Sequence, residues 1–170
     1  MMTLTEHVKT MYDFHTWANQ TLLNRLKELP EEVYMQEVQS VFPTISKVMN
    51  HIYIVDQGWL SMMGGKDMRE SMSGVGEMEK KLETKTVIEL EAMYRELAEQ
   101  FTAFFDQESD LERKIVLDNP YAGVRDTSLA EMVLQVVNHG TYHRGNVTAM
   151  LRQMGHASVM TEYAAYWYWG

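Results

Sequence analysis

Hydrophobic residues recur every three to four positions in four long stretches of the chain, a period that is typical of amphipathic helices. These stretches run from Thr3 to near Pro30, from Pro43 to Gly64, from Thr86 to Phe105 and from Ser128 to Gly155. A helix of that length extends over roughly 30–40 Å. The sequence therefore predicts four helices long enough to lie side by side along a common core.

The starts of these helices are marked by specific residues. Three of them begin with a hydroxyl residue followed three positions later by glutamate, the capping-box pattern, at Thr3, Thr86 and Ser128. The remaining one has Pro43 near its first turn, where the missing N–H of proline costs nothing. Four such helices bury their apolar stripes most simply against one another. We therefore expect an all-α fold, a four-helix bundle, formed by a single domain over residues 1–170.

Two of the connections between these helices differ in character. Residues 65–85 are polar and contain glycine, and they are long enough to cross the bundle, so that the second and third helices run parallel. Before the last helix, residues 114–117 favour a strand, while Asn119-Pro120 and Gly123 favour a turn. This segment predicts a short hairpin.

Composition narrows the functional classes. The chain has 24 acidic and 15 basic residues, a net charge of −9, which argues against a nucleic-acid partner because phosphate binding needs a basic face. The absence of cysteine excludes disulfides, thiolate ligands and thiol nucleophiles. No apolar run approaches the roughly 18 residues of a membrane span, and no signal-peptide core precedes the first helix. We expect a cytoplasmic protein without membrane contact.

The strongest candidate for chemistry is a pair of histidines in the last helix. His139 and His143 are four residues apart and continue the apolar line of Met132 and Val136, so both rings face the bundle interior. Such a pair arises by chance fairly often, but two buried imidazoles without partners are unfavourable, and a shared metal ion satisfies both. His51, on an inward face of the second helix, is the candidate third ligand, which reaches the same ion if the second and last helices are neighbours. Three imidazoles would leave a divalent ion with an open coordination position, as in catalytic sites.

Other interpretations of the histidines stay open. A lone buried histidine is more often a hydrogen-bonded core residue than a ligand. We expect that role for His15, with a position behind the ligands or facing the substrate as alternatives. His7 and His156 lie near helix ends and are expected on the surface. Di-iron bundles use Glu-x-x-His and zinc proteases use His-Glu-x-x-His, and both patterns are absent.

The motif NHGTYHRGN, residues 138–146, also carries a resemblance. The chain resembles the DinB/YfiT-like family of metalloenzymes in this motif and in three further pieces. These are YDFHTWANQTLLNRL in the first helix, ISKVMNHIYIVDQGWL in the second and the tyrosine-bearing tail. The last bundle helix of that family is close to Asn-His-x-x-x-His-Arg-Gly. The four pieces cover most of the chain in the family's order.

The resemblance implies a four-helix bundle in up-down-down-up order. It also implies a divalent ion, zinc or nickel for example, held by His51, His139 and His143, and a homodimer. Relatives with assigned chemistry are bacillithiol transferases and a mycothiol-dependent maleylpyruvate isomerase. In the isomerase branch a glutamate stands where this chain has His139, so this sequence is more similar to the all-histidine branch. Glu162-Tyr163 stands where relatives often have Asp-Tyr.

These observations favour a metal-dependent thiol transferase that joins a low-molecular-weight thiol to small electrophiles. A divalent ion at an open site can deprotonate a thiol, or bring the pKa of a water near 7, so a metal-dependent hydrolase is the alternative. A third possibility is a metal-binding or stress-response protein without turnover. Arg144 is the candidate catalytic residue, because its guanidinium can pair with a carboxylate of the substrate or of the thiol. A salt bridge to a neighbouring helix is the other role for Arg144, and Gly145 is expected to allow close helix approach.

Overall fold

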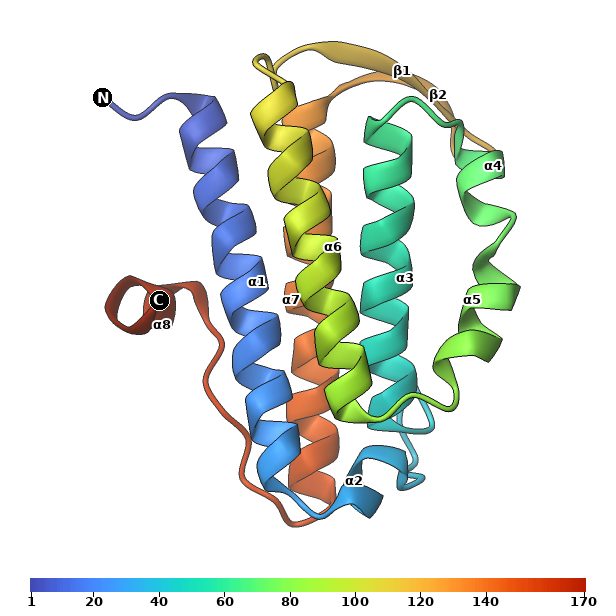
Figure 1. The fold of residues 1–170 in the computed structure, drawn as a ribbon, viewed down its shortest axis with the longest axis vertical. Helices are drawn as coiled ribbons and strands as arrows, with labels where there is room; N and C mark the ends of the chain where they lie inside the picture. The colour runs from blue at the N-terminus through green and yellow to red at the C-terminus, as the bar shows by residue number, and fades with distance from the viewer.

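The computed structural model describes residues 1–170 and is mostly helical, with one small two-stranded sheet (Figure 1). The four long helices form where the hydrophobic period predicts them: α1 (Leu4–Glu28), α3 (Ile45–Met63), α6 (Val87–Gln107) and α7 (Leu129–Gln153). All three predicted capping boxes are present, at Thr3, Thr86 and Ser128. In each, the hydroxyl accepts from the backbone N–H three residues on, and the glutamate carboxylate accepts from the backbone N–H of the capping residue.

The start of α3 differs from the prediction. Pro43 lies outside the helix, and Thr44 is the residue that caps it, because the Thr44 hydroxyl accepts a hydrogen bond from the Lys47 N–H. The Pro43 carbonyl instead accepts from the N–H of Val38 at 2.9 Å, which closes the preceding loop. The predicted stop is confirmed, since α3 ends at Met63 and Gly65 adopts a φ of 105°.

The connections contain short helices that the sequence does not reveal. Two of them, α4 (Met68–Met72) and α5 (Val75–Leu82), lie within the crossover between α3 and α6. In Figure 1 this crossover follows the length of α3. The other two are α2 (Glu31–Met35) and the C-terminal α8 (Tyr163–Trp169). These segments span one or two turns, too few to establish a clear hydrophobic period.

The predicted hairpin is confirmed. β1 (Lys114–Asn119) pairs antiparallel with β2 (Gly123–Ser128), in a register from Lys114 opposite Ser128 to Asn119 opposite Gly123. Gly123 has a φ of 98°, a conformation that side-chain-bearing residues rarely adopt. The hairpin lies across one end of the bundle and leads directly into α7 (Figure 1).

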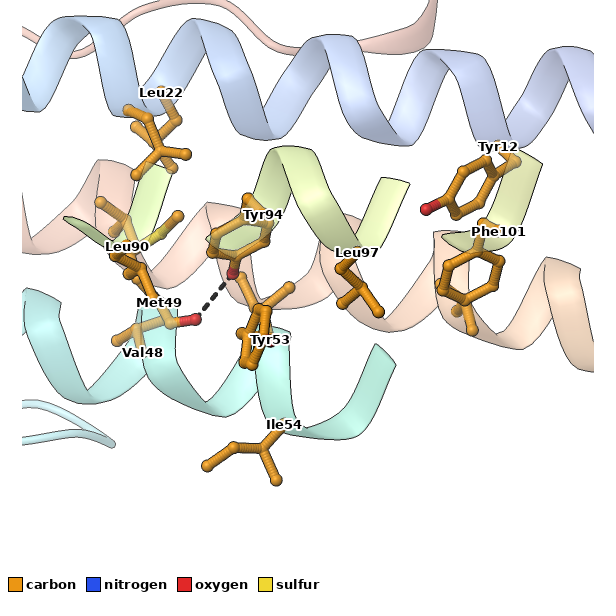
Figure 2. Close-up of a cluster of buried hydrophobic side chains, with 14 of the residues drawn as sticks. Tyr12, Leu22, Val48, Met49, Tyr53, Ile54, Leu90, Tyr94, Leu97 and Phe101 are labelled. Carbon is orange, nitrogen blue, oxygen red and sulfur yellow. Dashed lines mark hydrogen bonds between the residues drawn. The ribbon is translucent and has the colours of Figure 1, made fainter. Parts of the chain in front are cut away.

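The four long helices enclose one large hydrophobic core. α7 packs closely against both α1 and α3, and α6 packs more loosely against the same two helices. Figure 2 shows part of this core, in which the buried Tyr94 hydroxyl of α6 donates to the Met49 carbonyl of α3 at 2.7 Å. No helix combines the length and the apolar character that crossing a membrane requires.

Candidate metal centre

The three predicted ligands lie together between α3 and α7. One nitrogen from each of His51, His139 and His143 falls in a group whose atoms are all within 4.8 Å of one another. The ring centroids are 4.9 Å apart for His51 and His139, 4.7 Å for His51 and His143, and 4.5 Å for His139 and His143. The i,i+4 spacing on α7 and the packing of α3 against α7 therefore bring the three rings to one point.

The donor atoms suit a metal ion. The Nε2 atoms of His51 and His139 are 3.1 Å apart. Two nitrogens bound tetrahedrally at zinc distances of 2.0–2.1 Å would be separated by roughly 3.3 Å, so little movement is needed. Imidazole nitrogen is a good ligand for zinc, nickel, copper and iron. The three histidines could therefore hold one divalent ion.

Burial and the neighbouring rings keep two of these imidazoles, His51 and His139, neutral, the state that a metal ligand requires. Burial, followed by the nearby His143 and His51, lowers the pKa of His139 to about 3. Burial and His143 also lower the pKa of His51. At neutral pH both rings therefore present lone pairs instead of positive charges.

Neighbouring side chains hold the ring of His143 in place more firmly than the ring of His139. His143 is 8% exposed, and its Nδ1 donates to the Asn146 Oδ1 at 3.0 Å, which leaves its Nε2 lone pair free for a ligand role. The Phe42 ring lies 5.2 Å from the His51 ring and 5.4 Å from the His143 ring and covers that side of the group. The exposed Tyr142 contacts His143 edge to face at 5.0 Å. By contrast, the buried Nδ1 of His139 has no hydrogen-bond partner.

Comparison with known proteins assigns the chain to a family. The sequence profile of the DinB family matches residues 1–170. The chain belongs to the DinB family. It is 44% identical over 156 residues to the protein named Protein DinB of Bacillus subtilis strain 168, covering 92% of this chain and 91% of that one.

A crystal structure of another DinB-like protein from Bacillus subtilis has the same fold. The two superpose with a TM-score of 0.57 at 14% identity, covering 92% of this chain and 95% of that chain. At this identity the likeness shows the fold alone.

Arg144, the predicted catalytic residue, is placed apart from the three imidazoles of this DinB-family chain. Its side chain is 2% exposed and lies between α7 and α1. One guanidinium nitrogen contacts the His15 Nδ1 at 3.2 Å and the Asn19 Oδ1 at 2.8 Å, and another contacts the Thr141 hydroxyl at 3.1 Å. A substrate contact by Arg144 stays a prediction, and the observed contacts favour a role in holding α7 against α1.

Arg144 is linked to a buried carboxylate through His15. The His15 Nε2 lies 2.7 Å from the Asp56 Oδ2, and both residues are almost fully buried. Arginine cannot accept a hydrogen bond, so the His15 Nδ1 must accept from Arg144, and the His15 Nε2–H must donate to Asp56. A neutral imidazole thus joins a buried cation on α7 to a buried anion on α3. The expectation of His15 as a hydrogen-bonded core residue is confirmed, and both of its ring nitrogens are occupied.

The expectation for Gly145 is wrong, and Gly140 takes its place. Gly145 is exposed and has open space where a Cβ would lie. At Gly140, one helical position from His139, a Cβ would overlap the ring of His15 and come within 2.8 Å of an Arg144 nitrogen. The close contact of α1 with α7 therefore depends on Gly140.

The two glycines provide a matched test. We expect Gly140→Ala to lower the free energy of unfolding by about 1–3 kcal/mol, because the His15 ring is fixed at both nitrogens and cannot move aside. Gly145→Ala, at an exposed position of the same helix, should raise it by roughly 0.5–1 kcal/mol. Urea unfolding of both variants measures the difference. Equal effects would show that the close contact at Gly140 is unimportant.

The lowered histidine pKa values predict how the metal-free protein responds to acid. Above the ordinary histidine pKa of 6.5, His139 is neutral in both the folded and the unfolded chain. Below it, the unfolded chain binds protons that the folded His139 refuses until its pKa of about 3, so the free energy of unfolding falls as the pH falls through this window. Urea unfolding of chelator-treated protein at several pH values measures the slope. His139→Asn should show a shallower slope, and an unchanged slope would contradict the burial of a neutral His139.

Sequence reasoning missed three contributors to the site. Asn146 was detectable in principle, because it lies three residues after His143 and can reach its ring on a helix. Asp56 is an acidic residue on the buried face of α3, where only a partner makes burial acceptable. Phe42 could not be found, because it belongs to a loop whose path depends on tertiary packing.

Proposed function

We propose that this DinB-family chain binds a divalent ion, zinc or nickel, through His51, His139 and His143 and catalyses the transfer of a small thiol to small electrophiles. The observation that carries the proposal is the convergence of three imidazoles, without a fourth protein ligand in the group. Three protein ligands leave room for an exogenous one, the arrangement typical of catalytic centres. A homodimer is part of the same proposal and rests on the resemblance alone.

A divalent ion held by these three histidines would supply Lewis acidity, which lowers the pKa of a thiol or a water. The side chains of the protein orient the ligands and limit the access of water. Asn146 fixes the orientation of His143, and Phe42 covers the His51 and His143 rings, which limits access of water on that side. Reacting molecules must therefore approach past Phe42 or along the partly exposed edges of His51 and His139.

A cavity of about 270 Å³ adjoins the ligand His51 and provides a place for the small-molecule substrate. Phe42 and Ile54 form apolar walls, while Lys47, the buried Asn50 and the carboxylate of Glu79 provide polar groups. The Asn50 Oδ1 has no hydrogen-bond partner within the protein, so it is available as an acceptor. Lys47 pairs with Glu83 at 2.7 Å, and its ammonium could exchange this exposed partner for a carboxylate of the thiol.

The proposed reaction is a simple displacement. The thiol loses its proton to solvent, its sulfur forms a bond to the electrophilic carbon, and the leaving group departs with the electron pair of the broken bond. No oxidant or reductant is required. With water in place of the thiol, the same displacement would be hydrolysis.

Turnover of chlorodinitrobenzene by the metal-loaded protein, with and without 2-mercaptoethanol, tests the proposal. We expect thiol-dependent release of chloride that is lost in the triple variant with His51, His139 and His143 replaced by alanine and kept in His7→Ala, a surface histidine variant. Chloride release without thiol would favour the hydrolase. No turnover by protein that does hold the metal ion would favour a binding protein without catalysis.

A further inference from the structure

A second cavity lies on the other side of the bundle from the three histidines. The histidines lie where α7 packs against α3, whereas this cavity of about 380 Å³ is lined mainly by α1 and α6, with α8 at its rim. It forms where α6 packs loosely against its neighbours. Its size is within the range of small-molecule binding sites. Figure 2 shows Tyr12 of α1 and Tyr94 and Leu97 of α6, which line it.

The floor of the cavity carries an unused hydrogen-bond acceptor. Asp56 lines the cavity, is 2% exposed, and directs its Oδ2 to His15. Its second carboxylate oxygen, Oδ1, is buried and has no partner. A buried carboxylate oxygen without a donor is unfavourable, and a ligand in the cavity that donates a hydrogen bond to this atom would remove that cost.

The walls favour a positively charged donor. Four aromatic side chains surround the space: Tyr12, Trp17, Tyr94 and Tyr166. Aromatic faces attract ammonium groups and present nothing attractive to anions. A second carboxylate, Asp13, also lines the cavity and is opposed only by Arg95, an exposed side chain that lies 4.0 Å from Glu91. Asp56 and Asp13 both raise the pKa of Tyr12, after the larger effect of burial, as expected in a negative potential.

We propose that this cavity is a binding site for a small organic amine, whose ammonium group donates to the Asp56 Oδ1 and whose carbon skeleton packs between the aromatic walls. The site is independent of the three-histidine centre and of the reaction proposed for it. His15 acts there only by positioning Asp56, because its two nitrogens are engaged by Asp56 and Arg144. The hydrogen bond from the His15 Nε2–H fixes the orientation of the Asp56 carboxylate, which leaves its Oδ1 for the ligand.

Three probes of the same shape test the ligand class: benzylamine, benzyl alcohol and benzoate. Titrations of the full-length protein by calorimetry and by the indole NMR signal of Trp17 should show benzylamine binding at least about tenfold more tightly than benzyl alcohol, because only the former donates from a charged group. Benzoate should not bind. Benzoate binding as tightly as benzylamine would overturn the proposal. No benzylamine binding at millimolar concentration would also overturn it and would indicate that water is the partner of the Asp56 Oδ1.

Two variants locate the site. Ala98 lines the cavity on α6, so Ala98→Phe should fill it and weaken benzylamine binding by at least about tenfold without touching Asp56. Ala103→Phe, at an exposed position of the same helix, is the matched control and should bind as the wild type does. Amines can also ligate metals, so the triple histidine variant is titrated as well. If the triple variant binds benzylamine as tightly as the wild type does, the cavity is the binding site. If the triple variant no longer binds benzylamine, the amine binds at the metal centre and the proposal is overturned.

Discussion

Replacing Arg144 by methionine is expected to lower the free energy of unfolding by about 3–5 kcal/mol, the usual consequence of removing one partner of a buried ion pair. Burial lowers the pKa of Arg144 to about 10, so the side chain remains charged at neutral pH. Its charge is balanced by Asp56 through the intervening His15. Without Arg144, the Asp56 carboxylate stays buried without a counter-charge, and the Asn19 Oδ1 loses its donor.

Urea unfolding of Arg144→Met measures this effect, and Arg152→Met is its matched control. Arg152 is an exposed residue near the end of the same helix, so its substitution should change the free energy of unfolding by no more than about 0.5 kcal/mol. Arg144→Lys should also be strongly destabilising, because an ammonium cannot reach His15, Asn19 and Thr141 with the geometry of the planar guanidinium. Similar free energies of unfolding for Arg144→Met and Arg152→Met would contradict a stabilising role of the buried Arg144–His15–Asp56 network.

Removing His143 should weaken metal binding by about a hundredfold or more. Structural zinc sites in peptides gain roughly 10–16 kcal/mol from four ligands, or about 3 kcal/mol for each, which corresponds to two orders of magnitude in affinity. Asn146→Ala leaves the ligand in place but frees its ring to rotate, since the bond between the His143 Nδ1 and the Asn146 Oδ1 is lost. A loss of roughly tenfold or more is expected.

Competition titrations with a chromophoric chelator measure both affinities. His7→Ala is the control, because His7 is exposed on α1, and its affinity should equal that of the wild type. The order of affinities should be wild type, then Asn146→Ala, then His143→Ala. Equal affinity of Asn146→Ala and the wild type would show that the His143 ring needs no support from Asn146.

The parts of this fold that the sequence predicts are those with a regular physical period. The long helices repeat their apolar residues often enough to be recognised, and the capping boxes at Thr3, Thr86 and Ser128 mark where three of them begin. The hairpin is predictable because Gly123 permits the backbone conformation of its turn. The i,i+4 spacing of His139 and His143 places them on one face of α7 for the same reason.

The remaining features depend on packing between segments distant in the sequence. The contact of Gly140 with His15 requires a specific crossing of α1 and α7, and the sequence pattern alone does not reveal that Gly140 lies at this crossing. Arg144 follows His143 directly, but a helical turn of about 100° per residue directs it to α1 instead of to the histidines. The cavity beside Asp56 lies where α6 packs loosely against its neighbours, and no local sequence pattern encodes that packing.

We propose that His51, His139 and His143 together bind one divalent metal ion. Elemental analysis of the purified protein, combined with X-ray absorption at the edge of the metal found, tests it most directly. We predict one ion per chain with three imidazole ligands, and no ion in the variant with all three histidines replaced by alanine. Equal metal content in the two proteins, or a bound ion without imidazole ligands, would contradict a three-histidine metal site.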